Sequence, residues 1–279
     1  MGKKKARHAP SQGGSLWQKP KKSLGQNFIL DEGLLESLYA LTGIGDGALA
    51  LEIGAGLGTL TKVLAKHCRE VITIELDHTL VPLLRVMFEK QPVRVVEGDA
   101  LKIDLGELTA QWDRFHVVAN IPYYLTTDLV TRLLFSRLPI DTMNLMVQKE
   151  AAQRLTAGIG EEGYCLLSLQ CAYFGTARIL QEVGKECFDP VPKVDSAFVS
   201  MTFGTPKYRD DAALEKRFFK IITAAFAMRR KTLQNNLMNA FSLSREEAGA
   251  WLESAGIDSM ARGETVPLEA FYRLTECGA

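Results

Sequence analysis

Four consecutive residues, Asn120-Ile121-Pro122-Tyr123, combine groups that could act on an amine attached to an aromatic ring. Such an amine is a poor nucleophile because its lone pair is delocalised into the ring. The side-chain oxygen of Asn120 and the carbonyl of Ile121 could accept its two hydrogens and direct the lone pair towards an electrophile. Pro122 would stiffen the turn, and Tyr123 would stack on the ring. The alternative is a structural turn with buried aromatic side chains.

A glycine-rich turn precedes this motif, in the segment LEIGAGLGTLT over residues 51–61. Glycine lets the backbone turn sharply and approach a ligand closely, which favours Gly54 and Gly56 as parts of a nucleotide-cofactor site. A dinucleotide-binding fingerprint would have a third glycine at position 59, where Thr59 stands instead. A tight structural turn between a strand and a helix is the alternative.

Two carboxylates follow the next two apolar runs. Glu75 lies 21 residues after Gly54, where it can accept hydrogen bonds from both hydroxyls of a ribose. Asp99 follows the third run, in Gly98-Asp99-Ala100. Ligands of open α/β sheets bind at the carboxyl ends of the strands, so we expect these carboxylates and the glycine turn to lie together.

The elements that must position these groups are short apolar runs with helical segments between them. Seven such runs predict an α/β fold with a doubly wound, Rossmann-like sheet of seven strands. The first four are typical of buried parallel strands. The predicted strands are Ala48–Ile53, Val71–Ile74, Val93–Val96, Phe115–Ala119, Thr142–Val147, Ala177–Val183 and Ala197–Phe203. Asp31 is a good N-cap for a helix that precedes them.

The pattern changes near residue 205, after which only helical periodicity remains. Two apolar stripes, a capping box at Ser244–Glu247 and Pro267 in a first turn predict four helices. We therefore expect three parts: a disordered basic tail at 1–20, an α/β domain at 21–205 and a small all-helical domain at 206–279.

The 33 Lys and Arg residues balance 33 Asp and Glu, but their distribution is uneven. Residues 1–22 and 216–245 each hold seven basic residues and no acidic one. This segregation indicates a polyanionic partner, with a solvated tail and helix face as the alternative. No run approaches the ~20 apolar residues of a membrane helix. Without a CxxC pair or clustered histidines, we expect no metal site and read the five cysteines as reduced thiols of a cytosolic protein.

The glycine segment resembles motif I of S-adenosylmethionine-dependent methyltransferases, and Asn120–Tyr123 resembles the (Asn/Asp)-Pro-Pro-(Tyr/Phe) motif of amino-methyltransferases. Three further segments complete an ordered set: Gln26-Asn27-Phe28-Ile29, Phe188-Asp189-Pro190-Val191-Pro192-Lys193-Val194-Asp195-Ser196 and Arg229-Arg230-Lys231-Thr232-Leu233. Together they resemble the ribosomal RNA adenine N6-dimethyltransferase family over about residues 20–275. Ala55, Ile121 and Ile29 depart from the family's usual residues without removing an expected ligand.

The resemblance implies a function and its residues. The Gln-Asn-Phe segment would close over S-adenosylmethionine, and Asp99 would accept a hydrogen bond from the adenine amine of the cofactor. The residues that would bind the cofactor are Asn27, Ile29, Gly54, Gly56, Glu75, Asp99 and Asn120. The catalytic set would be Asn120, Ile121, Pro122, Tyr123 and Phe188. The reaction would dimethylate two adjacent adenines in the 3′-terminal hairpin of 16S ribosomal RNA, on the 30S pre-ribosomal particle, by a cytoplasmic monomer.

Some alternatives stay open at this level. Phe188 could stack on the opposite face of an extruded adenine, or anchor its loop in the core. Arg229, Arg230 and Lys231, in a segment expected to open a helix, could contact RNA phosphates or be solvated charges. The competing functions are a 23S ribosomal RNA adenine N6-methyltransferase of the antibiotic-resistance type and a non-catalytic assembly or transcription factor on the same fold.

Overall fold

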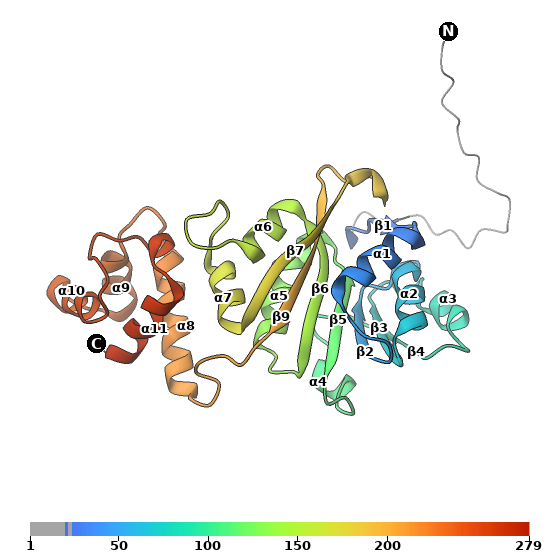
Figure 1. The fold of residues 1–279 in the computed structure, drawn as a ribbon, viewed down its shortest axis with the longest axis horizontal. Helices are drawn as coiled ribbons and strands as arrows, with labels where there is room; N and C mark the ends of the chain where they lie inside the picture. Colours follow the sequence, from blue (N-terminus) through green and yellow to red (C-terminus); the bar gives the residue numbers. More distant parts are fainter. Residues whose placement is uncertain (1–19, 22–23, 279) are drawn as a thin grey trace, which may run out of the picture.

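The computed structural model describes residues 20–21 and 24–278, so the expected tail falls almost wholly outside the described residues. Figure 1 shows a sheet-containing body followed by a group of helices. The strands are β1 (Phe28–Ile29), β2 (Leu49–Ile53), β3 (Glu70–Glu75), β4 (Val93–Glu97), β5 (Phe115–Asn120), β6 (Ile140–Gln148), β7 (Gly175–Val183), β8 (Phe188–Asp189) and β9 (Ser196–Phe203).

The α-helices are α1 (Glu32–Thr42), α2 (Thr59–His67), α3 (Val81–Met87), α4 (Leu105–Leu108), α5 (Thr126–Phe135), α6 (Lys149–Thr156), α7 (Leu166–Phe174), α8 (Ala212–Ala227), α9 (Leu233–Phe241), α10 (Arg245–Ser254) and α11 (Leu268–Cys277). Short 3₁₀ turns lie at η2 (Tyr123–Leu125), η3 (Lys185–Cys187) and η4 (Gly263–Thr265). Asp31 caps α1 and the Ser244–Glu247 capping box opens α10, as the sequence predicts.

The main sheet confirms all seven predicted strands, in the order β4-β3-β2-β5-β6-β9-β7. Strands β4, β3, β2, β5 and β6 run parallel, whereas β9 runs antiparallel to both of its neighbours. The apolar runs did not indicate this reversal, because they carry no information on strand direction. The parallel order places the carboxyl ends of β2, β3, β4 and β5 along one edge of the sheet.

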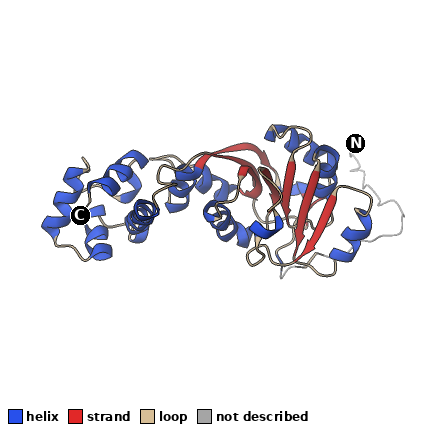
Figure 2. Cartoon of the chain, turned by 90° about the horizontal axis from the view of Figure 1, so that it is seen from below, coloured by secondary structure: helices blue, strands red, loops and turns tan. Residues whose placement is uncertain are grey.

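Helices cover both faces of the sheet, as Figure 2 shows. Alternate residues of each central strand serve the two cores, since successive side chains point to opposite faces. In β2, Leu51 and Ile53 join the core beneath α5 and α7, while Ala50 joins the core beneath α1 and α2. All five residues of β2 are buried, which explains why the strand is apolar in the sequence apart from Glu52.

A second, two-stranded sheet pairs β1 with β8, and the sequence pattern did not predict it. Phe28 lies opposite Asp189, and Ile29 lies opposite Phe188. Two-residue strands are too short to show an alternating pattern, so only the tertiary structure reveals this pairing. The pairing joins the segment before α1 to the proline-containing loop before β9.

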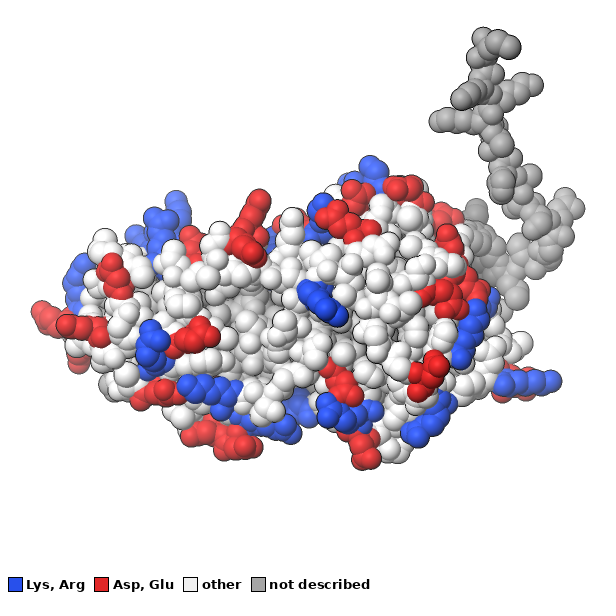
Figure 3. All heavy atoms as spheres, viewed as in Figure 1, with Lys and Arg blue, Asp and Glu red and all other residues white. Residues whose placement is uncertain are grey.

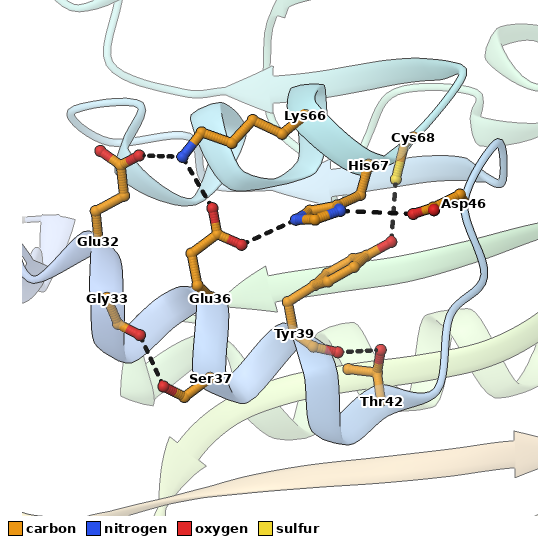
Figure 4. Close-up of polar contacts among 10 residues, drawn as sticks. All are labelled: Glu32, Gly33, Glu36, Ser37, Tyr39, Thr42, Asp46, Lys66, His67 and Cys68. Carbon is orange, nitrogen blue, oxygen red and sulfur yellow. Dashed lines mark hydrogen bonds and ion pairs between the residues drawn. The ribbon is translucent and has the colours of Figure 1, made fainter.

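Helix α1 is held on α2 by a polar cluster, shown in Figure 4. Lys66 pairs with both Glu32 and Glu36, and Nε2 of His67 lies 2.9 Å from Oε2 of Glu36. The His67 ring stacks on Tyr39 with 4.8 Å between the ring centroids. Exposed ion pairs contribute little one at a time, but this network acts together with the buried apolar face of α1. The chain segment that leads into α1 is thereby fixed at one end.

The helices α8–α11 pack against the sheet body through a seam of aromatic side chains. Tyr173 on α7 stacks on Phe218 of α8, with ring centroids 4.7 Å apart. Arg137 pairs with Glu215 across the same junction. We call this group the aromatic seam: Phe135, Tyr173, Phe174, Tyr208, Phe218, Phe219 and Tyr272.

The aromatic seam should contribute strongly to stability. Phe218 is fully buried, so Phe218→Ala removes a large apolar surface and leaves a cavity. We expect a loss of about 3–5 kcal/mol in the free energy of unfolding. Urea unfolding followed by circular dichroism measures it. Val86→Ala, at a position that is 77% exposed, is the control and should change the free energy by less than about 0.5 kcal/mol. A loss below about 1 kcal/mol for Phe218→Ala would contradict the packing described.

Candidate active site

A cleft lies at the carboxyl ends of the parallel strands and opens to solvent, with about 990 Å³ of space in and in front of it, open solvent included. It brings together residues that follow four different strands: Gly54 after β2, Glu75 at the end of β3, Asp99 after β4 and Asn120 at the end of β5. Residues 24–29 cross over the cleft and line it from above, and we call them the strap. The cleft therefore lies at the edge of the sheet that the sequence predicts to bind a ligand.

The glycine turn of the cleft uses the conformations that only glycine adopts easily. Gly54 and Gly56 have φ angles of +82° and +55°. A Cβ atom on Gly56 would lie 2.8 Å from the Phe28 ring of the strap, so any side chain there would push the strap away. The turn thus needs glycine twice, for the backbone path and for the close approach of the strap.

Glu75 is buried at the base of the cleft. Its Oε2 accepts the backbone N–H of Gly56, and its Oε1 accepts the N–H of Asp77, both at 2.7 Å. Burial raises the pKa of this carboxyl above its ordinary value, although the two backbone donors oppose the rise. Each oxygen keeps a lone pair, so a ligand with two hydroxyl donors would meet an acceptor that is fixed in place.

Asp99 lines the same cleft from the turn after β4. Its Oδ1 accepts the N–H of Leu101 at 2.9 Å, and its Oδ2 lies 3.3 Å from Nζ of Lys102. The local hydrogen bond sets the direction of the carboxylate, while Lys102 itself is largely exposed. The side chain of Asp99 is 28% exposed, which leaves it accessible to a ligand in the cleft.

Asn120 is oriented by the strap. Its Nδ2 donates a 2.9 Å hydrogen bond to the backbone carbonyl of Asn27. Because a carbonyl can only accept, this bond fixes which end of the amide is nitrogen. The Oδ1 atom is therefore the end left to accept a hydrogen from a ligand. The side chain of Asn27 in turn donates to the carbonyl of Gly25 at 3.2 Å, which stabilises the curve of the strap.

The rest of the Asn120 motif forms the far wall of the cleft. The Ile121 side chain is buried, and its N–H bonds to the carbonyl of Met146 on β6. Pro122 leads into the 3₁₀ turn that holds Tyr123. The Tyr123 hydroxyl lies 2.8 Å from Oγ of Ser196, so its half-buried ring is fixed between the cleft and β9. Burial raises the pKa of Tyr123, which stays a neutral phenol.

Asp77 holds the strap closed, and the sequence did not single it out. Its Oδ1 pairs with Nζ of Lys21 at 2.6 Å, and its Oδ2 accepts from Nε2 of Gln26 at 3.3 Å. Burial alone would raise the pKa of Asp77, but the hydrogen bonds from Lys21 and Thr79 lower it to about 2. The available signal was its place two residues after Glu75, which puts it at the same edge of the sheet.

Phe188 lies outside the cleft. It is 3% exposed and packs in the core beneath α1 with Ile29, Leu35 and Phe198. The predicted catalytic role needs a ring face directed at a ligand, and this position buries both faces. The structure therefore favours the anchoring alternative: Phe188 holds its loop and, through the β1–β8 pairing, holds Ile29 of the strap.

Arg229, Arg230 and Lys231 are exposed in the turn between α8 and α9. The segment was expected to open a helix, but α9 begins at Leu233 with Thr232 as its N-cap. Arg229 pairs with Glu264 at 3.2 Å. Figure 3 shows basic side chains at the upper edge of the helical part, the side on which α8 ends in Figure 1. The carboxyl ends of the parallel strands lie on that same side.

Glu52 lies beneath the glycine turn and is fully buried. Its Oε2 accepts hydrogen bonds from the hydroxyls of Thr61 on α2 and Thr73 on β3, each at 2.6 Å. Its Oε1 has no partner among the described residues. Burial raises the pKa of Glu52 to about 7, because the two hydroxyls offset only part of the lost hydration.

Glu52 should make stability depend on pH. Its pKa is about 7 in the folded protein and 4.5 for the exposed carboxyl, so the folded state binds more protons between these values. The free energy of unfolding should therefore fall as the pH rises from 4.5 to 7, by on the order of 3 kcal/mol. Glu52→Gln cannot ionise and should remove this part of the slope.

Urea unfolding at pH 5 and pH 8 measures this dependence. Glu97→Gln replaces an exposed carboxylate on β4 and is the matched control. The hypothesis for Glu52 would be wrong if Glu52→Gln and the wild type lost the same stability between the two pH values.

The groups present fit an adenosine-containing cofactor better than a metal ion. Carboxylates on two strand ends, a bare glycine turn and a covering strap form a cradle for a ribose and a flat ring. In residues 20–21 and 24–278, no three His, Cys, Asp or Glu side chains are grouped to hold a metal ion. Within the same residues, no helix combines the length and apolarity needed to cross a membrane.

Comparisons with known proteins agree with this geometry. A family model described as ribosomal RNA adenine dimethylase matches residues 17–278. A ribosomal RNA small subunit methyltransferase A from Clostridium botulinum is 38% identical over 258 residues, which cover 92% of this chain and 93% of that protein. The protein of the same name from Staphylococcus haemolyticus is 38% identical over 265 residues, covering 92% of this chain and 89% of that one.

Two solved structures share the whole architecture. The 23S rRNA methyltransferase ErmE has a TM-score of 0.70 at 26% identity, covering 90% of this chain and 99% of that one. A dimethyladenosine transferase from Plasmodium falciparum has a TM-score of 0.71 at 25% identity, covering 87% and 94%. Because the family model spans nearly all described residues and the relatives exceed 30% identity over most of their length, the chain belongs to the ribosomal RNA adenine dimethylase family.

Proposed function

We propose that this protein transfers methyl groups from S-adenosylmethionine to the N6 amines of two adjacent adenines in the 3′-terminal hairpin of 16S ribosomal RNA. The observation that carries the proposal is the Asn120–Asn27 hydrogen bond, which leaves Oδ1 of Asn120 as the atom that would accept from the amine. The small-subunit substrate is supported by the names of the relatives at 38% identity.

The cofactor would lie in the cradle with its parts matched to the groups around it. Glu75 would accept the two ribose hydroxyls, and Asp99 would accept the adenine amine. Gly54, Gly56 and Asn120 would line the methionine end, which Asn27 and Ile29 of the strap would cover. When bound, S-adenosylmethionine supplies a sulfonium, a strong electrophile that needs no activation by the protein.

The chain's own residues would prepare the amine. Asn120 Oδ1 and the Ile121 carbonyl would accept its two hydrogens, which favours a tetrahedral nitrogen with its lone pair directed at the methyl group. Tyr123, fixed by Ser196, would stack on the adenine ring. Positioning of this kind could supply much of the rate acceleration, so no general base is assigned.

The adenine must leave its helix to reach this site, and the protein must therefore grip the surrounding RNA. The helical part at 206–279 is proposed to do so through Arg229, Arg230 and Lys231, with an affinity that falls with salt. We also propose that the protein acts as a monomer. A 30S precursor as the substrate would place the reaction in the cytoplasm of a bacterium.

The second candidate is methylation of 23S ribosomal RNA. The structural match to ErmE over 90% of the chain favours it, because the two chains share the fold at a TM-score of 0.70. The higher identity of the small-subunit enzymes favours the first proposal. Mapping of the modified nucleotides by primer extension separates the two. A non-catalytic factor would bind the cofactor but turn over no RNA.

Asn120→Ala should lower the rate of methyl transfer by at least about 100-fold and leave the affinity for the cofactor within a few-fold of wild type. The reason is that the amide aligns the amine, whereas Glu75 and Asp99 would hold the cofactor. Transfer of radiolabel to under-methylated 30S subunits and calorimetric binding of S-adenosylhomocysteine give the two readouts. The proposed function would be wrong if folded wild-type protein transferred no radiolabelled methyl group to any ribosomal RNA.

Phe188→Leu should test whether Phe188 anchors or stacks. As an anchor it needs only apolar volume, so leucine should keep methyl transfer within a few-fold of wild type. Phe188→Ala should lower the free energy of unfolding by about 3–5 kcal/mol. Initial rates and urea unfolding, measured on both variants, give the comparison. A drop of tenfold or more in rate for Phe188→Leu at unchanged stability would show that the ring stacks on the substrate.

A further inference from the structure

Tyr124 stands at the mouth of the cleft with most of its ring exposed. The chain has seven tyrosines, and the structure describes all of them. Tyr124 is 61% exposed, whereas the other six are buried or partly buried. No described residue forms a hydrogen bond with its hydroxyl. Single exposed aromatics are ordinary on protein surfaces, so the position of the ring, rather than its exposure alone, gives it meaning.

Bare backbone of the strap lies against the Tyr124 ring. A Cβ atom on Gly25 would lie 3.2 Å from Cδ1 and Cε1 of Tyr124 and 3.6 Å from Cβ of Pro122. Gly25 has a φ of +59°, so its position in the strap suits glycine both by conformation and by space. The strap therefore packs beside both the Tyr124 ring and Pro122, which leaves the rest of the ring open to a ligand at the mouth.

The side chains of Tyr123 and Tyr124 lie in different parts of the cleft. Both lie in η2, where successive side chains of a 3₁₀ helix are about 120° apart. The Tyr123 ring is fixed against Ser196 in the wall of the cleft, and Tyr124 lines its mouth. A ligand that contacts both rings must therefore reach from the wall of the cleft to its mouth.

We infer that Tyr124 is the stacking platform for the nucleotide next to the target adenine. The inference rests on the proposed function: a strand that delivers one adenine to Asn120 carries its neighbour to the mouth. Stacking of a base on an aromatic side chain is tolerant of sequence and strongest for large rings. In the proposed substrate the neighbour is itself an adenine, whichever of the two occupies the cleft. Tyr124 is thus a positioning residue for RNA.

The test pairs a change in the protein with a change in the RNA. Small subunits are reconstituted with 16S RNA whose 3′-terminal fragment carries either the native adenine or an abasic nucleotide beside the target. With native RNA, Tyr124→Ala should lower kcat/KM on the order of tenfold, mainly through KM. Tyr124→Phe keeps the ring and should restore it. With abasic RNA, the wild type should fall to the level of Tyr124→Ala, and the variant should lose little more.

Other outcomes overturn the inference in distinct ways. An equal loss for Tyr124→Ala on both RNAs would mean that the ring does not contact that base. Weaker binding of S-adenosylhomocysteine by Tyr124→Ala would assign the ring to support of the strap instead. If Tyr124→Ala kept the wild-type kcat/KM on native RNA, Tyr124 would have no role in RNA binding. If the wild type methylates neither RNA, the proposed function fails, and that result is distinguishable from the others.

Discussion

The hydrogen bond from Asn120 to the carbonyl of Asn27 is the constraint on which the site depends. It joins the end of β5 to a segment 93 residues earlier in the chain and decides which end of the amide faces the cleft. The strap that carries the carbonyl is held at three places: by Asp77, by the β1–β8 pairing and by the α1–α2 cluster. In the proposed reaction, opening the strap would break this hydrogen bond, and Asn120 would then no longer align the amine.

Two carboxylates of the site, Glu75 and Asp77, are two residues apart and have opposite pKa shifts. Glu75 lies deeper in the protein, and burial is the main cause of its raised pKa. Asp77 has the ammonium of Lys21 against it, whereas Glu75 has only backbone N–H groups. The charge of Asp77 is thus compensated within the protein. The charge of Glu75 is only partly compensated by the protein. This suits a carboxylate that would accept further hydrogen bonds from a bound ligand.

Much of the fold was predictable because the central strands β2, β3 and β5 are largely buried and appear as separate, mostly apolar runs. The same strand ends located Gly54, Glu75, Asp99 and Asn120, since parallel strands bring their ends together. What the sequence did not show depends on contacts between distant segments. The pairing of Ile29 with Phe188 and the burial of Phe188 follow from packing that no local pattern records. The direction of β9 was hidden because an apolar run carries no information on strand direction.

The aromatic seam has a consequence for substrate choice. Large rings interlocked across two parts of a protein resist sliding, because a small shift forfeits many close contacts at once. The basic turn after α8 and the cleft on the sheet are therefore held at a set separation. Under the proposed function, the enzyme can engage both only on RNA whose phosphates and target adenine span that separation. Under the same proposal, the aromatic seam would make binding depend on the distance between these groups in the RNA as well as on the RNA sequence.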